Sequence, residues 1–150
     1  MGVLTFEKEY TSSVPRDKLF NFLTKDYYQL LPKVAKPIHS VEHVGGSLHK
    51  INHVSDGERD SMLQKVEAID EKNYRYKWSI EKGSDFPKNV EKKSFDTTLY
   101  EGPNGGSVAK ITASYFYKGD IPPTQQEIQS GEDKGNALFK DIESYLTQTN

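Results

Sequence analysis

The chain has 150 residues, of which 34% are hydrophobic and 11% aromatic, and it carries a formal net charge of −2. This length predicts one domain, residues 1–150, and the mild negative charge argues against a general attraction to nucleic acid. With no cysteine, no apolar run long enough to span a membrane and no signal-like segment in residues 1–10, we expect a monomeric cytoplasmic protein without disulfides or thiolate metal sites.

The first third of the chain predicts a strand followed by an interrupted helix. Residues 3–10 alternate apolar and polar side chains, as in a half-buried strand. Ser13 fits the N-cap of a helix, and Pro15 fits its first turn. We expect the helical stretch to break into two short helices around residues 25–26 and to end near Pro32.

The middle of the chain predicts further strands, and its end predicts a long helix. The strand-like segments cover residues 40–44, 48–54, 61–70, 74–81, 91–101 and 107–118. Turn residues separate them, for example Asp56-Gly57. Residues 125–146 have the apolar stripe of an amphipathic helix. Strands joined by short turns favour an antiparallel sheet, one face of which such a helix can cover, so we expect an α+β fold.

The last predicted helix contains an unusual stretch at residues 129–136. This stretch includes Gly131 and Gly135 and has no large apolar side chain. Each glycine inside a helix costs roughly 1 kcal/mol relative to alanine. Two interpretations are open: the helix frays or kinks here, or small residues leave space between the helix and the sheet. A hollow would also agree with the low hydrophobic share.

Five motifs distributed along the chain are similar to those of one protein family. They are residues 2–7 (GVLTFE), 31–34 (LPKV), 65–70 (KVEAID), 101–107 (EGPNGGS) and 138–146 (LFKDIESYL). Their order is kept over nearly the whole length. The chain therefore resembles the plant pathogenesis-related class-ten proteins, the family of the major birch pollen allergen, and especially its legume members.

The resemblance implies a helix-grip fold, in which a curved seven-stranded antiparallel sheet wraps around a long C-terminal helix, with two short helices after the first strand. It also implies an internal cavity for amphipathic ligands such as cytokinins and other phytohormones, flavonoids, sterols and fatty acids. One feature departs from the family. Its glycine-rich loop is shortened here to Gly45-Gly46, an ordinary hairpin turn, so we do not expect this loop to bind phosphate.

The candidate site combines apolar walls with a few polar tips, which is the usual composition of a small-molecule site. His53 matches a position that the family turns into its cavity, and we expect it to orient a ligand together with Gln64 and Tyr76. The full set of predicted ligand-binding residues is Leu23, Tyr28, Leu31, Ile38, Ile51, His53, Met62, Gln64, Tyr76, Trp78, Phe95, Thr97, Lys134, Gly135 and Leu138.

A metal site is a weaker interpretation of the histidines. Four of them lie close together in the sequence: His39, His43, His49 and His53. A metal needs three or four converging ligands, and only Glu42 lies nearby, on the opposite side of its strand from His43. We therefore expect neither a metal nor a cofactor.

Catalytic interpretations use other residues. By the resemblance, Glu91, Glu143 and Tyr145 match residues proposed for ribonuclease activity, but surface ion pairing explains the two carboxylates. Some relatives use a lysine in the cavity for enzymatic steps of specialised metabolism, and Lys134 is the candidate for that role. We expect a non-catalytic, defence-related binder of amphipathic small molecules. The alternatives are an enzyme acting in the same cavity, a ribonuclease, or a hormone-dependent interaction protein.

Overall fold

The computed structural model describes residues 1–55, 57–83 and 86–148. It begins with strand β1, Gly2–Ser12. The helical stretch that follows comprises α1 (Arg16–Asn21), a π-helical turn η1 (Phe22–Asp26) and α2 (Tyr27–Val34). The predicted interruption is therefore present, as a wide turn. Asp56, part of the turn predicted at residues 56–57, lies outside the described residues.

Six further strands and the C-terminal helix complete the fold. The strands are β2 (Ile38–Gly45), β3 (Leu48–Ser55), β4 (Glu58–Asp70), β5 (Arg75–Gly83), β6 (Val90–Glu101) and β7 (Ser107–Tyr117). A short 3-10 helix η2 (Pro103–Gly105) joins β6 to β7, and α3 covers Gln125–Gln148. No helix in the described ranges combines the length and the apolarity needed to cross a membrane.

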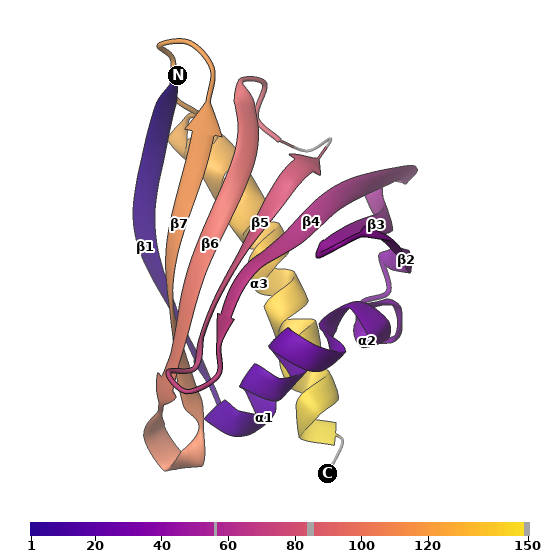
Figure 1. The fold of residues 1–150 in the computed structure, drawn as a ribbon, viewed down its shortest axis with the longest axis vertical. Coiled ribbons are helices and arrows are strands. Elements are labelled where there is room, and N and C mark those ends of the chain that lie inside the picture. Colours follow the sequence, from indigo (N-terminus) through magenta and orange to yellow (C-terminus); the bar gives the residue numbers. More distant parts are fainter. Residues whose placement is uncertain (56, 84–85, 149–150) are drawn as a thin grey trace.

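All seven strands form one antiparallel sheet in the order β1-β7-β6-β5-β4-β3-β2. Each strand from β2 to β7 pairs with its neighbours in the chain, whereas β1 closes the far edge by pairing with β7. Figure 1 shows the sheet curving around α3, with α1 and α2 beside the C-terminal half of that helix. The predicted α+β helix-grip fold is confirmed.

One local prediction about α1 was wrong, and one about α2 was confirmed. Pro15, not Ser13, occupies the N-cap of α1, and Ser12 Oγ accepts a hydrogen bond from the Val14 N–H at 3.0 Å. Helix α2 passes through Pro32 and ends at Val34, near the predicted end. A proline lacks only its own N–H, and the Ala35 N–H still closes the last turn on the Leu31 carbonyl at 3.0 Å.

Both ends of α3 are fixed by hydrogen bonds. At its start, Thr124 Oγ1 accepts from the Glu127 N–H at 3.1 Å, and Glu127 Oε1 accepts from the Thr124 N–H at 2.9 Å, which is a capping box. Near its end, Lys18 Nζ donates to the Leu146 carbonyl, where a cation also complements the helix dipole. Between these ends α3 is one continuous helix.

Three groups of buried apolar side chains form the core. The first joins α1, η1 and the end of α3, the second lies between α2 and strands β2 and β3, and the third lies on β6 and β7. Their buried members are Val14, Leu19, Phe20, Phe22, Leu99, Ala109, Ile142 and Leu146; Leu31, Ala35, Ile38 and Ile51; and Val90, Phe95, Ala113 and Tyr115. Helix α3 packs on the first group through Ile142 and Leu146 and on the third through Ile128.

The two glycines of α3 differ in what a side chain would meet. A Cβ atom at Gly135 would find nothing within 4 Å, whereas one at Gly131 would lie 3.1 Å from Lys93 Nζ. We expect Gly135→Ala to raise the free energy of unfolding by about 1 kcal/mol, because alanine is the better helix former. Gly131→Ala should give a smaller gain, because the Lys93 ammonium must move. Urea unfolding measures both, and a destabilised Gly135→Ala protein would contradict this description of α3.

Candidate functional site

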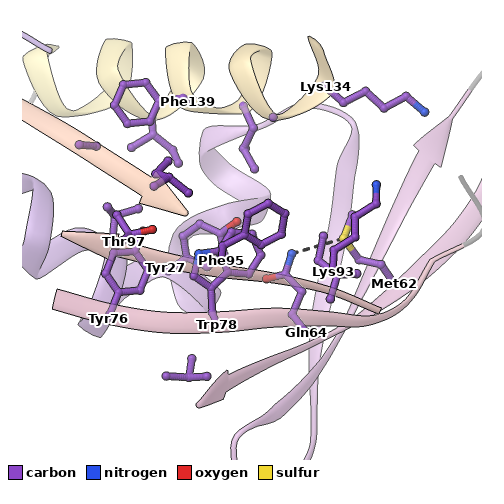
Figure 2. A pocket seen from close by; sticks show the side chains of 18 of the residues that line it. Tyr27, Met62, Gln64, Tyr76, Trp78, Lys93, Phe95, Thr97, Lys134 and Phe139 are labelled. Carbon is purple, nitrogen blue, oxygen red and sulfur yellow. Dashed lines mark hydrogen bonds between the residues drawn. The ribbon is translucent and has the colours of Figure 1, made fainter. Parts of the chain in front are cut away.

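A pocket with an open volume of about 220 Å³ lies between α3 and the inward face of the sheet. Figure 2 shows Tyr76, Trp78, Gln64 and Phe95 on the sheet side of this pocket and Phe139 on the side of α3. The glycines at positions 131 and 135 both border this space. Small residues in α3 therefore coincide with a hollow and not with fraying of the helix.

Most of the residues predicted to contact a ligand do line this pocket. They are Leu23, Tyr28, Met62, Gln64, Tyr76, Trp78, Phe95, Thr97, Lys134, Gly135 and Leu138. Strand alternation explains the positions of those on β4, β5 and β6. In β4 the pairing shifts between Val66 and Ala68, and after this irregularity Ile69 faces the pocket. Ligand binding by these residues stays a prediction.

Four residues predicted to line the cavity lie elsewhere. Leu31, Ile38 and Ile51 pack together with Ala35 in the second core group. His53 is 7% exposed and pairs with Ile38 across the β2–β3 ladder, outside the pocket lining. The physical reason is that α2 packs on β2 and fills this end of the sheet. The predicted role of His53 in orienting a ligand has no support in this placement.

Polar tips are spaced among the aromatic walls. The Tyr28 hydroxyl donates to Gln64 Oε1 at 3.3 Å, and Gln64 Nε2 points to the Met62 sulfur at 3.3 Å. The rings of Trp78 and Phe95 stack with centroids 4.5 Å apart. The Thr97 hydroxyl is buried and interacts with that of Tyr76. Such groups can hydrogen-bond a guest that the apolar walls enclose.

Two lysines that sequence reasoning missed also line the pocket. Lys8 of β1 follows the same alternation as Leu4 and Phe6, and Lys93 of β6 follows that of Phe95. Alternation alone would have placed both on the inner face. They were missed because a charged residue on a strand is usually solvent-exposed.

Lys134, the candidate catalytic lysine, projects from α3 but does not point at the aromatic wall of the pocket. In Figure 2 its side chain points to the side, away from Trp78 and Phe95. Glu91, a candidate for ribonuclease activity, forms an ion pair with Lys118 at 3.1 Å. The ring of Tyr145 packs near that of Phe22 in the core, with centroids 6.2 Å apart.

The histidines on β2 and β3 contact other groups. The His49 ring stacks on Tyr28 with centroids 3.8 Å apart, and His43 Nε2 lies 2.7 Å from the Gly46 carbonyl oxygen. Gly46, in the turn between β2 and β3, has a φ of 55°, the left-handed conformation that a tight hairpin turn favours. Among the described residues, no group of three or more His, Cys, Asp or Glu side chains is placed to hold a metal ion.

The tyrosines of the pocket keep their protons well above neutral pH. Burial raises the pKa of Tyr27 to about 12, and burial is also the main cause of the raised pKa values of Tyr28 and Tyr76. At pH 7 these hydroxyls are therefore neutral groups that can both donate and accept hydrogen bonds.

The raised pKa of Tyr27 predicts how stability depends on alkaline pH. The folded state holds this phenol proton more tightly than the unfolded chain, so the stability it contributes is complete below the ordinary pKa of about 10. It is lost as pH rises toward about 12. We expect Tyr27→Phe to flatten this loss in urea unfolding, whereas Tyr100→Phe, at an exposed site, should not. An unchanged alkaline slope in Tyr27→Phe would contradict the burial of this hydroxyl.

The fold and the pocket together define a class of protein. A curved antiparallel sheet that grips a long helix, with an aromatic-lined pocket between them, is a helix-grip protein of the type found in plant pathogenesis-related proteins. The model of the pathogenesis-related protein Bet v 1 family matches residues 1–149. The chain belongs to this family.

Curated relatives support this assignment over almost their whole length. Pathogenesis-related protein 2 of Phaseolus vulgaris is 44% identical over 151 aligned residues, covering 97% of both chains. Class-10 pathogenesis-related protein 1 of Medicago truncatula is 42% identical, covering 97% of this chain and 96% of the relative. The stress-induced protein SAM22 of Glycine max is 43% identical with the same coverage.

Solved structures agree with the fold. The crystal structure of Ara h 8.0201 is 38% identical and aligns with a TM-score of 0.88, covering 99% of this chain and 100% of that one. Norcoclaurine synthase from Thalictrum flavum, solved with dopamine and hydroxybenzaldehyde, aligns with a TM-score of 0.74 at 12% identity, covering 99% of this chain and 89% of that one. The latter similarity shows a shared fold only.

Proposed function

We propose that this protein is a non-catalytic binder of planar, amphipathic small molecules, which it takes up in the pocket between α3 and the sheet. The observation that supports this most is the stacked Trp78–Phe95 pair on the pocket wall. A flat apolar guest can lie against these rings, and each Å² of apolar surface removed from water stabilises the complex by about 25 cal/mol.

Orientation of the guest would come from the polar tips. The Gln64 amide, the Thr97 hydroxyl and the neutral Tyr76 phenol offer donors and acceptors at separate points of the wall. Such a mixture suits ligands with a flat apolar body and a few hydroxyl or amine groups. Cytokinins and other phytohormones, flavonoids and sterols fit this description.

The biological setting follows from the family. The relatives described above are named as pathogenesis-related or stress-induced proteins, and we infer a role of the same kind for this chain in plant defence. We further infer that residues 1–150 act as one ligand-binding domain, as a monomer and in the cytoplasm. A reducing compartment agrees with the cysteine-free composition.

Filling the pocket tests the proposal. Trp78 is the sole tryptophan, so its fluorescence reports on guests that enter. The panel contains cytokinins, flavonoids and a fluorescent apolar dye. We expect at least one member to bind, seen as quenching of the Trp78 fluorescence or as an increase in the fluorescence of the dye. In Gly135→Leu the affinity for that ligand should fall about tenfold or more, because the new side chain enters open space beside the pocket.

The matched control is Ala137→Leu, which adds a similar side chain at an exposed position of the same helix. It should bind as the unchanged protein does, and circular dichroism should show both variants folded. Failure of every panel member to bind would overturn the proposal. Equal binding by Gly135→Leu and Ala137→Leu would move the site away from this pocket.

A further inference from the structure

Two histidine rings meet at the end of the β2–β3 hairpin. His43 of β2 and His49 of β3 lie directly opposite each other in the strand pairing, and their ring centres are 5.1 Å apart. Only Gly46 and Ser47 lie between the two strands. Figure 1 shows these strands at one edge of the sheet, beside α2. The short turn therefore brings two imidazoles together.

The turn also determines which nitrogen of each ring carries the proton. His43 Nε2 lies 2.7 Å from the Gly46 carbonyl oxygen. His49 Nδ1 lies 3.3 Å from the Ser47 carbonyl oxygen. A carbonyl oxygen can only accept a hydrogen bond, so these ring nitrogens are the donors, and in a neutral imidazole the other nitrogen holds a lone pair. Histidines that bind metals are commonly oriented in this way, with one ring N–H bonded to a backbone carbonyl.

The separation of the two rings suits one shared metal ion. A metal about 2.0–2.1 Å from a ligating nitrogen lies roughly 3.2 Å from the centre of that imidazole ring. Two such rings at angles of about 90–110° around the metal have centres about 4.5–5.2 Å apart. The observed separation of 5.1 Å between His43 and His49 lies within this range.

The surroundings of His49 keep its ring ordered and neutral. The ring stacks on Tyr28 with an angle of 8° between the planes, which covers a face of the imidazole, whereas a metal binds at the edge. Burial lowers the pKa of His49 and His43 acts in the same direction, while the hydrogen bond to the Ser47 carbonyl opposes them. At pH 7 the His49 ring is therefore neutral, as a metal ligand must be.

We propose that His43 and His49 form a binding site for one divalent transition-metal ion of the copper, nickel or zinc type. Imidazole nitrogens suit these ions, whereas Mg²⁺ and Ca²⁺ prefer oxygen ligands. The neighbouring carboxylate, Glu42, instead accepts a hydrogen bond from Asn52 Nδ2 at 2.8 Å. Among the residues that the structure describes, no third His, Cys, Asp or Glu completes a cluster with the pair, so water would fill the other coordination positions.

This site goes beyond the proposed binding of small molecules, because neither histidine lines the pocket. His43 is exposed and His49 is half-buried, so the pair faces solvent at the edge of the sheet. The sequence led us to expect no metal, since a third protein ligand was missing. The contacts of the turn carbonyls with both rings, which no sequence pattern encodes, are the reason to depart from that expectation.

Calorimetry and electron paramagnetic resonance test the site on the full chain without an affinity tag. We expect Cu²⁺ to bind with saturation at one ion per chain, Zn²⁺ to bind more weakly, and Mg²⁺ not to bind, following the ligand preferences of these ions. The Cu²⁺ spectrum should show coupling to two imidazole nitrogens. Absence of saturable binding by Cu²⁺ and Zn²⁺, or coupling to a single imidazole nitrogen, would overturn the proposal.

Variants locate the site. His43→Gln removes one ligand at an exposed position, and His49→Phe removes the other while keeping a flat ring against Tyr28. Each should weaken Cu²⁺ binding about tenfold or more, because even the outer partners of metal ligands are worth about 10–100-fold. Each should also leave coupling to one nitrogen. The matched control is His39→Gln, at an exposed position of the same strand β2, which should bind as the unmodified protein does.

The outcomes separate this site from other places where a metal could bind. If His43→Gln and His49→Phe bind Cu²⁺ as tightly as His39→Gln does, the ion is bound elsewhere and the assignment is wrong. The spectrum of the unmodified protein tests the site even if a variant fails to fold, which circular dichroism detects. Failure of the metal site leaves the proposed function untouched, because the small-molecule panel reports on the pocket around Trp78.

Discussion

The packing of α3 against the sheet is the constraint on which the rest of this structure depends. Near its start, Ile128 packs on the third core group. Near its end, Ile142 and Leu146 belong to the first core group. Between these anchors Gly131 and Gly135 supply no side chain to fill the gap. Burial of one large aliphatic side chain is worth about 1.5–3 kcal/mol. The anchors therefore offset the cost of two helix-interior glycines, and a hollow remains between them.

The chemistry of the hollow follows from the strands that face it. Alternation on β4, β5 and β6 turns Gln64, Trp78 and Phe95 toward α3. The same alternation turns Lys8 and Lys93 inward, although each ammonium must then lie among aromatic rings. Aromatic faces accommodate a cation through their quadrupoles, which reduces the cost of removing it from water. The wall is therefore apolar, aromatic and positively charged, a combination that distinguishes it from an ordinary dry core.

Sequence patterns predicted the fold well because they report on local rules. Turn residues and period-two alternation located the strands, and the collinear motifs implied the order of the elements. The structure departs from the sequence-based expectations at the start of α1 and at one end of the sheet. Pro15 takes the N-cap that Ser13 was expected to occupy. Leu31 of α2 belongs to the same core group as Ile51 of β3, outside the pocket lining, because α2 covers that end of the sheet.

The sequence by itself determined which side chains share a face of each strand, since alternation depends only on the backbone of that strand. It thereby specified most of the pocket wall. Through Gly131 and Gly135 it also indicated that the middle of α3 would lack large side chains. Only the tertiary structure decided that this part of α3 lies over the sheet, between two ends that pack on the core. It alone brought Lys8 of β1 and Lys93 of β6 to one wall, because β7 pairs with both strands and sets their distance. Interactions between residues so far apart in the chain depend on strand pairing and helix packing, which no local pattern encodes.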